Sequence, residues 1–345
     1  MTVERTLDAE RLERYLDVAE PSIGHVSSVQ HIEGGQSNPT YLVKASSGRY
    51  VLRRKPPGNL LPSAHAVDRE FRVIRALKST DVPVPNALCF CDDPSVIGTV
   101  FYVMEFVDGE IFRSPDLPGM AAAQRSRIYD ELNRVIAALH CIDPASVGLE
   151  DFGKAGNYAQ RQIARWTKQY RASETDKIDA MERLIEWLPE NIPADEGETR
   201  IIHGDYRIGN VIFDRHELRI LAVLDWELAT LGNPLADFAY HCMPYRLSPS
   251  LPNSVGGGNL AQLGIPSEAE YIERYCARTG REAIHDFDFY AAFSMFRLAA
   301  ILQGIRAREL QGNASSAHAA EAGRKARPLA EAGWVQAMRA SGTQH

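Results

Sequence analysis

The sequence predicts an α+β protein with two lobes: a small N-terminal lobe built on an antiparallel sheet and a larger, mainly helical C-terminal lobe. Before residue 106, short β-like segments alternate with turn residues, and one long amphipathic helix interrupts them. After Asp108-Gly109, apolar residues recur at helical spacing along most of the chain. A chain of 345 residues is also long for a single core. We therefore predict one lobe over residues 1–105 and the other over 106–345.

The small lobe is predicted from alternating strand patterns and helical spacing. Asp8 is placed to cap a short helix at the start of the chain. Apolar residues between Val67 and Leu77 recur at helical spacing, which predicts an amphipathic helix over Ala64–Lys78. Val82-Pro83-Val84-Pro85 ends this helix, because proline cannot continue it. Strands are predicted at Val26–Ile32, Thr40–Ala45, Tyr50–Arg54, Asn86–Cys91 and Val100–Phe106.

The large lobe is predicted to be helical apart from one hairpin, which pairs Val211–Phe213 with Ile220–Leu224. Prolines and glycines in Ser248–Asn259 predict a mobile loop outside the core. The Ala-, Gly- and Ser-rich chain from Glu309 to the end is expected to fray in part. Helices are predicted around residues 128–139 and at Tyr158–Ala172, Asp176–Leu188, Pro234–Cys242, Glu268–Arg278 and Phe287–Glu309.

Composition and charge argue against several classes of protein. The net charge of −7 disfavours a nucleic-acid partner, because such binding relies on Lys and Arg contacts with phosphates. No apolar run is long enough to span a bilayer, and Met1–Glu13 lacks the apolar segment of a signal peptide, so no membrane partner is expected. The five cysteines are scattered without a CxxC pair, which is typical of thiols in a reducing compartment. We expect a cytoplasmic protein.

The most informative motif is Ile202-His203-Gly204-Asp205-Tyr206-Arg207-Ile208-Gly209-Asn210, followed after the hairpin by Leu224-Asp225-Trp226. Phosphoryl transfer from ATP needs a carboxylate to orient a hydroxyl and hard oxygen ligands that hold Mg²⁺ on the phosphates. Asp205 is predicted to take the hydroxyl proton late in the transfer. Asn210 and Asp225 are the predicted Mg²⁺ ligands, because the hairpin joins them and would fix their separation. In the simpler alternative, the three residues only shape turns and a strand end.

Arg207 is the second candidate catalytic residue. A cation two residues after the carboxylate can neutralise the charge that spreads over the γ-phosphoryl oxygens. The alternative is an exposed arginine that pairs with a local carboxylate. A rival reading combines His203, Asp205, Asp225 and His241 in a transition-metal hydrolase centre. The spacing disfavours it, because no His pair stands four residues apart with a third ligand.

Further segments carry a resemblance to a known family. They are GGQSNPTY at Gly34–Tyr41, YVLR at Tyr50–Arg53, YVMEF at Tyr102–Phe106 and GNPLADFAY at Gly232–Tyr240. With the catalytic motif, they make the chain resemble the aminoglycoside phosphotransferase family over roughly residues 20–310, and more narrowly the kinase-like domain attached to certain acyl-CoA dehydrogenases. The resemblance implies a protein-kinase-like fold, ATP and Mg²⁺ as cofactors, a small-molecule acceptor and a functional link to an acyl-CoA dehydrogenase.

The nucleotide-binding residues depart from the protein-kinase pattern of GxGxxG followed by a strand Lys. Gly34-Gly35-Gln36-Ser37-Asn38 stands in place of the first, and its backbone amides with the Ser37 and Asn38 side chains are expected to cover the phosphates. Arg53 stands in place of the Lys and is expected to pair with Glu70 of the helix and to contact phosphates. A solvent-facing Arg53 is the alternative.

The resemblance also implies roles for the connection between the lobes and for the residues behind the catalytic loop. Glu105–Val107 is the expected hinge, with the backbone of Glu105 and Val107 bonded to the adenine edge. Asp237 is expected to brace the catalytic loop through backbone amides, and His203 to pack behind Asp205.

The acceptor site is predicted from a basic stripe. Arg161, Arg165, Lys168 and Arg171 follow at spacings of four, three and three residues, so they lie on one helix face. Such a stripe suits an acceptor with phosphates, and we expect Arg161, Arg165 and Lys168 to contact a coenzyme A thioester. A solvated helix face is the alternative. The favoured function is a hydroxyacyl-CoA kinase. An aminoglycoside-type antibiotic kinase, which needs an acidic pocket, and a nucleotide-binding pseudokinase that acts as a partner module stay open.

Overall fold

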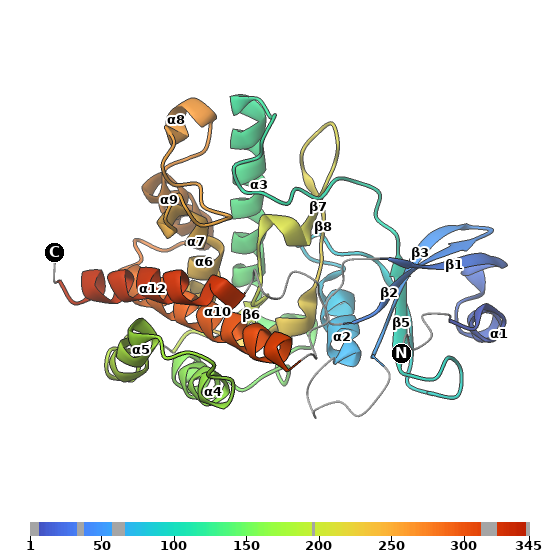
Figure 1. The fold of residues 1–345 in the computed structure, drawn as a ribbon. Coiled ribbons are helices and arrows are strands. Elements are labelled where there is room, and N and C mark those ends of the chain that lie inside the picture. Colours follow the sequence, from blue (N-terminus) through green and yellow to red (C-terminus); the bar gives the residue numbers. More distant parts are fainter. Residues whose placement is uncertain (1–6, 33–37, 57–65, 195–196, 312–322, 343–345) are drawn as a thin grey trace.

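The computed structural model describes residues 7–32, 38–56, 66–194, 197–311 and 323–342. Figure 1 shows the antiparallel sheet of the small lobe beside the helices of the large lobe. The predicted two-lobed α+β fold is therefore confirmed. No helix within these described ranges combines the length and apolarity that crossing a membrane requires.

The small lobe is a five-stranded antiparallel sheet with the order β1-β2-β3-β5-β4. Its strands are β1 (Val26–Ile32), β2 (Thr40–Ala45), β3 (Gly48–Arg54), β4 (Ala87–Cys91) and β5 (Phe101–Glu105), and its helices are α1 (Ala9–Ala19) and α2 (Val67–Leu77). Side chains alternate along a strand, so Phe101 and Val103 of β5 pack with α1, whereas Tyr102 packs with α2. The Asp8 side chain caps α1 as predicted. The α2 side of the sheet is the one that faces the large lobe.

The large lobe packs five of its helices against α10 (Phe287–Leu310), whose residues Phe289–Arg297 are buried on all sides, as the centre of a core helix should be. The other helices are α3 (Ala122–Cys141), α4 (Tyr158–Ala172), α5 (Asp179–Glu190), α6 (Pro234–His241), α7 (Met243–Arg246), α8 (Leu260–Leu263), α9 (Glu268–Thr279) and α12 (Ala326–Ala340), with short 3-10 helices at Pro21–Ile23, Pro144–Val147, Ile208–Asn210 and Trp226–Leu228. Helices α4, α5, α6, α7 and α12 all contact α10.

Two pairs of short strands carry the catalytic motif. The predicted hairpin is present as β7 (Val211–Phe213) and β8 (Ile220–Val223). A second pair, β6 (Arg200–Ile202) with β9 (Thr230–Gly232), was not predicted as a pair, because three-residue strands give almost no periodic signal. The catalytic loop runs from the end of β6 to the start of β7.

Two expectations about irregular segments need correction. Ala326–Ala340 does not fray but forms α12, which packs on α10. Small residues permit the close approach: a Cβ at Gly333 would lie 3.1 Å from Cβ of Met295. In the Pro- and Gly-rich loop, Val255 is only 4% exposed and joins the core, so the loop is anchored at its centre.

Candidate active site

The catalytic loop, residues 203–210, is braced by Asp237 of α6. The Asp237 side chain is buried and accepts the backbone N–H groups of His203 and Gly204, each at 2.8 Å. His140 of α3 adds a third contact, from Nε2 to Oδ2 at 3.2 Å. Burial opposes the negative charge, but the hydrogen bond and charge of His140 outweigh it and hold the pKa of Asp237 below its ordinary value. These contacts are the ones expected of a residue that holds the loop in place.

His203 is turned away from the chemistry. Its Nδ1 accepts the backbone N–H of Asp205 at 3.1 Å, and its Nε2 lies 2.8 Å from the Leu224 carbonyl oxygen. A carbonyl only accepts, so the ring is the neutral Nε2–H tautomer. Because both ring nitrogens are engaged, His203 cannot ligate a metal, and the rival hydrolase centre loses one of its ligands. Next to it, Gly204 has a φ of +83°, and a Cβ there would lie 2.8 Å from the Leu228 carbonyl oxygen, so this turn requires glycine.

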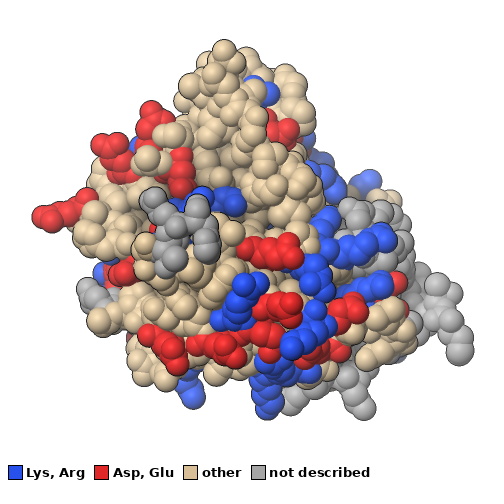
Figure 2. Space-filling view, turned by 60° about the vertical axis from the view of Figure 1, so that its left-hand side comes forward, with Lys and Arg blue, Asp and Glu red and all other residues tan. Residues whose placement is uncertain are grey.

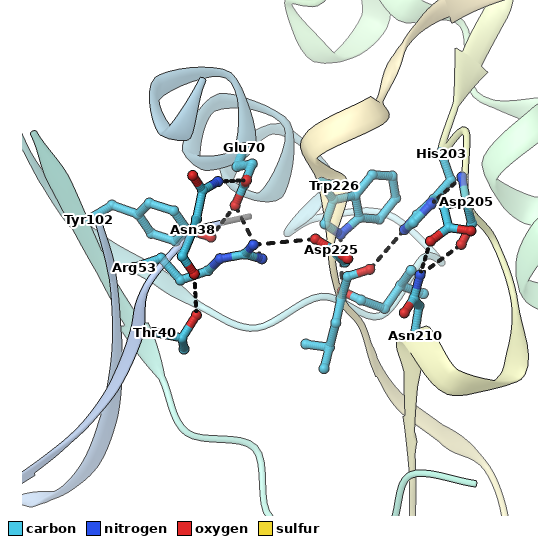
Figure 3. Close-up of polar contacts among 12 residues, drawn as sticks. Asn38, Thr40, Arg53, Glu70, Tyr102, His203, Asp205, Asn210, Asp225 and Trp226 are labelled. Carbon is cyan, nitrogen blue, oxygen red and sulfur yellow. Dashed lines mark hydrogen bonds and ion pairs between the residues drawn. The ribbon is translucent and has the colours of Figure 1, made fainter. Parts of the chain in front are cut away.

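The Asp205 carboxylate is held by side-chain donors on both oxygens. Oδ2 accepts from Asn210 Nδ2 at 2.8 Å and from Arg207 Nε at 3.2 Å, and Oδ1 accepts from the Tyr240 hydroxyl at 2.5 Å. Asn210 Nδ2 also reaches the Asp205 carbonyl at 2.9 Å. Since both partners of this amide are acceptors, its nitrogen must face Asp205 and its Oδ1 must face away. The structure thus brings the predicted Asp205, Arg207 and Asn210 together (the Asp205–Asn210 contact is drawn in Figure 3).

Asp225 follows β8 in the left-handed backbone conformation, with a φ of +65°. The hairpin fixes its place relative to Asn210, because the backbone N–H of Leu224 donates to the Asn210 carbonyl at 2.8 Å. Figure 3 shows Asp225 between Arg53 on one side and the Asp205–Asn210 pair on the other. Asn210 Oδ1 and the Asp225 carboxylate are hard oxygens on a rigid support, a donor set that fits Mg²⁺.

Arg53 of β3 links the small lobe to this site. Its Nη1 lies 3.3 Å from Glu70 Oε2, which is the predicted strand–helix pair, and its Nη2 lies 3.3 Å from Asp225 Oδ1. The Arg53 side chain is 12% exposed, so it is not solvent-facing. Burial opposes its charge, but the surrounding acidic side chains and Tyr102 raise the pKa of Arg53 above its ordinary value.

Glu70 is fully buried and accepts from Asn38 Nδ2 at 2.7 Å and from the Tyr102 hydroxyl at 2.9 Å (Figure 3). Asn38 was expected at the phosphates, but it is buried and supports Glu70, so a phosphate contact of its side chain stays a prediction. Ser37 lies outside the described residues.

Two backbone N–H groups of the hinge already donate hydrogen bonds within the protein. Glu105 N–H donates to the Asn86 carbonyl at 2.9 Å, and Phe106 N–H donates to the Arg49 carbonyl at 3.2 Å. Of the two residues predicted to contact adenine, Glu105 therefore does not offer its N–H for that purpose, and the contact of Val107 stays a prediction.

A cavity of about 380 Å³ opens beside Asp205. Most of its lining is apolar, and among the residues that the structure describes Asp205 is the one acidic side chain in it. Three basic side chains, those of Arg113, Arg207 and Lys325, border it, and Tyr240 lines it while donating its hydroxyl to Asp205. The remaining lining comes from α3, α6, α7, α10, α12 and the loop anchored at Val255: Tyr129, Leu132, His241, Met243, Pro244, Tyr245, Leu247, Leu251, Pro252, Asn253, Leu298, Leu302 and Leu329, with Pro115, Ile208 and Gly209. Sequence reasoning missed Arg113, Tyr240 and Lys325, because residues so far apart in the chain share no local pattern.

The basic stripe of α4 does not border the cavity beside Asp205. Arg161, Arg165 and Lys168 stand on α4, and none of them lines the cavity beside Asp205. Arg161 donates to backbone carbonyls just before α4, and Arg171 pairs with Glu182 of α5 at 2.5 Å. On the face of the molecule that Figure 2 draws, acidic and basic side chains intermix along the lower part rather than forming a field of one sign. Contact of Arg161, Arg165 and Lys168 with the acceptor stays a prediction.

Comparison with known sequences agrees with this geometry. The model of the APH family, described as the phosphotransferase enzyme family, matches residues 28–293. Mouse acyl-CoA dehydrogenase family member 10 is 47% identical over 327 residues, covering 94% of this chain and 30% of that protein. Human acyl-CoA dehydrogenase family member 11 is 42% identical over 335 residues, covering 96% of this chain and 43% of that protein. This chain thus spans less than half the length of either relative.

Solved structures give the same fold. The crystal structure of a candidate aminoglycoside phosphotransferase from Ralstonia eutropha is 50% identical, with a TM-score of 0.89 over 97% of this chain and 99% of that one. A spectinomycin phosphotransferase bound to ADP and spectinomycin has a TM-score of 0.64 over 96% of this chain and 99% of that one. At 15% identity, the second match supports the fold alone. The resemblance drawn from the motifs is confirmed.

Proposed function

This chain belongs to the phosphotransferase enzyme family, and we propose that it transfers the γ-phosphoryl group of ATP to a hydroxyl of a small-molecule acceptor. One observation carries the proposal: the Asp205 carboxylate is hydrogen-bonded to Asn210 and also lines a cavity of about 380 Å³. A carboxylate in this position can receive the proton of a hydroxyl bound in the cavity. The family supplies the reaction class, and the cavity supplies room for the acceptor.

The residues divide the chemistry among them. The acceptor oxygen forms a bond to the γ-phosphorus while the bond to the bridging oxygen of ADP breaks, and the hydroxyl proton passes to Asp205. Arg207 neutralises charge on the transferring group. Asn210 Oδ1 and Asp225 would hold Mg²⁺, which neutralises phosphate charge when bound. Val107 would donate its backbone N–H to adenine.

The acceptor class follows from the cavity lining. An apolar wall with basic side chains at its edge suits an acyl group joined to an anionic carrier, and hydroxyacyl-CoA thioesters have this character. Arg113 is exposed and has no hydrogen bond or ion pair with another described residue, so it is available for an anionic group. The relatives named as acyl-CoA dehydrogenases support the same class and a functional link to such an enzyme.

Two alternatives are less well supported. An aminoglycoside-type kinase needs carboxylates for a polycationic sugar, and the segment Glu268–Glu273, the acidic stretch that would serve, does not line the cavity. Glu268 instead pairs with Arg246 at 2.6 Å. A pseudokinase partner module would not need the Asp205 carboxylate hydrogen-bonded to Asn210, which with Asp225 is a predicted metal ligand.

The proposal is tested by ATP consumption in the presence of hydroxyacyl-CoAs, aminoglycosides, choline and sugars. We expect ADP and a phosphorylated hydroxyacyl-CoA, detected by mass spectrometry. Asp205→Asn should bind ATP normally but lower kcat by about 10²–10⁴-fold, the usual contribution of a positioned acid–base group. Absence of phosphorylated product with every acceptor, or a loss below about threefold in Asp205→Asn, would count against the proposal.

A matched pair of variants locates the acceptor phosphates. Arg113→Glu borders the cavity and Arg165→Glu lies on the α4 stripe, and both reverse one exposed charge. We expect Arg113→Glu to raise the acceptor KM about tenfold, as loss of a charge-assisted bond should, with the ATP KM unchanged. If Arg165→Glu has the larger effect, the stripe holds the acceptor and the cavity assignment is wrong.

A further inference from the structure

The hydrogen bonds of Asp205 leave few directions from which a hydroxyl can reach it. Each carboxylate oxygen offers two lone-pair sites. On Oδ2, both are filled, by Asn210 Nδ2 at 2.8 Å and Arg207 Nε at 3.2 Å. On Oδ1, one is filled by the Tyr240 hydroxyl at 2.5 Å. Among the contacts of the described residues, the single open site is therefore on Oδ1, directly beside the Tyr240 phenol.

Tyr240 is held firmly in this position. Its ring lies 5.5 Å from the guanidinium of Arg297, a buried side chain of α10. Arg297 in turn donates to the Gly204 carbonyl at 2.7 Å, which ties the ring to the catalytic loop. Burial and the charge of Asp205 raise the pKa of Tyr240 far above its ordinary value, so the phenol keeps its proton and always donates. Tyr240 also lines the cavity, so it borders the route by which an acceptor reaches Asp205.

We propose that Tyr240 is a positioning residue that directs the acceptor hydroxyl to the last open site of Asp205 Oδ1 and keeps water from competing for the base. The inference rests on the proposed phosphotransferase function and adds to it a choice between two nucleophiles. With the acceptor in place, its oxygen bonds to the γ-phosphorus, ADP leaves with the electron pair of the broken bond, and the proton goes to Asp205. With water in that place, the same bonds change and the products are ADP and inorganic phosphate.

Removal of the phenol oxygen opens a second site on Oδ1 that water from the cavity can reach. Tyr240→Phe should therefore increase ATP hydrolysis without any acceptor about ten- to a hundredfold, the effect of one hydrogen bond to a charged group. Transfer to the acceptor should fall by a similar factor, and the ATP KM should stay within about twofold. A residue that only supported packing would lower both reactions when changed, so the rise in hydrolysis is the decisive measurement.

Tyr15→Phe is the matched control. Tyr15 of α1 lies outside the cavity and donates its hydroxyl to the Phe90 carbonyl at 3.0 Å, so the same substitution there also removes one hydrogen bond but leaves Asp205 untouched. We expect its acceptor-free hydrolysis to equal that of the wild type. Melting temperatures of both variants should stay within about 3 °C of the wild type, because each change removes one oxygen atom.

The experiment uses Mg-ATP with water as the nucleophile and needs no identified acceptor for its first arm. Unchanged or lower hydrolysis in a folded Tyr240→Phe that binds ATP overturns the role of Tyr240, and so does an equal rise in Tyr15→Phe. If the wild type transfers phosphate to an acceptor in the second arm, such a result leaves the proposed function intact. If the wild type neither transfers nor hydrolyses, the proposed function fails and this inference fails with it.

Discussion

Replacing Asp237 with Asn should show how much the catalytic loop depends on its buried brace. Asp237 accepts the N–H groups of His203 and Gly204 at 2.8 Å, one on each carboxylate oxygen. Asparagine has one acceptor oxygen, so its NH₂ group must face one of these two donors. The substitution preserves size and leaves Asp205 itself unchanged, which separates the support of the loop from its chemistry.

The expected loss of stability is about 3–5 kcal/mol. A hydrogen bond to a charged acceptor contributes about 1.5–3 kcal/mol, and the buried N–H left without a partner costs a further 1–3 kcal/mol or so. An unfolding entropy of roughly 2.1 cal/mol/K per residue gives about 0.7 kcal/mol/K for 345 residues, so the melting temperature should fall by about 4–7 °C. A shift of about 1 Å in the loop should lower kcat about 10²-fold with little change in the ATP KM.

Asp214→Asn provides the control. Asp214 also accepts two backbone N–H groups, those of His216 at 2.8 Å and Glu217 at 2.7 Å, but in a solvent-accessible turn. Water can replace a lost partner there, so we expect a cost of at most about 1 kcal/mol and normal turnover. Urea unfolding, calorimetry and steady-state rates of both variants give the comparison. Equal losses in the two variants, or normal turnover in Asp237→Asn, would refute the reasoning that burial makes this brace essential.

The remaining predictions concern one predicted metal ligand and a partly buried histidine. Asp225→Ala should abolish Mg²⁺-dependent binding of ATP, because it removes the carboxylate of the proposed metal pair. Titration calorimetry with and without Mg²⁺ measures this, and an unchanged Mg²⁺ effect would make Asp225 purely structural. Burial lowers the pKa of His241 from 6.5 to about 4. Between these pH values the unfolded chain therefore binds more protons than the folded chain. The stability that is present above pH 6.5 should be lost as the pH falls toward 4. The loss is at most about 3 kcal/mol. The free energy of unfolding, measured with urea, should therefore change more steeply with pH in the wild type than in His241→Gln over this window. An equal pH dependence in the two proteins would contradict the prediction.

Prediction from sequence succeeded where the signal is local. The strands Val26–Ile32 and Thr40–Ala45 and the helix Tyr158–Ala172 have the predicted bounds, because alternation and helical spacing are properties of neighbouring residues. Asp205 and Asn210 stand in one short loop, and a hairpin carries the chain from there to Asp225, so their proximity follows from chain connectivity. Prediction missed the helix at Ala326–Ala340, because composition indicated a tail that frays in part, whereas this segment packs on α10 as a helix.

The sequence by itself determined the two-lobed fold, the phosphotransferase family and the chemical identity of the catalytic loop, since each depends on residue types at short, fixed spacing. The tertiary structure decided which side chains share the acceptor cavity. Arg113, Tyr240 and Lys325 border it from three distant parts of the chain, whereas the basic stripe of α4 does not reach it. The physical reason is that contacts across a core depend on how the helices pack around α10, and local periodicity contains no information about which distant faces will meet.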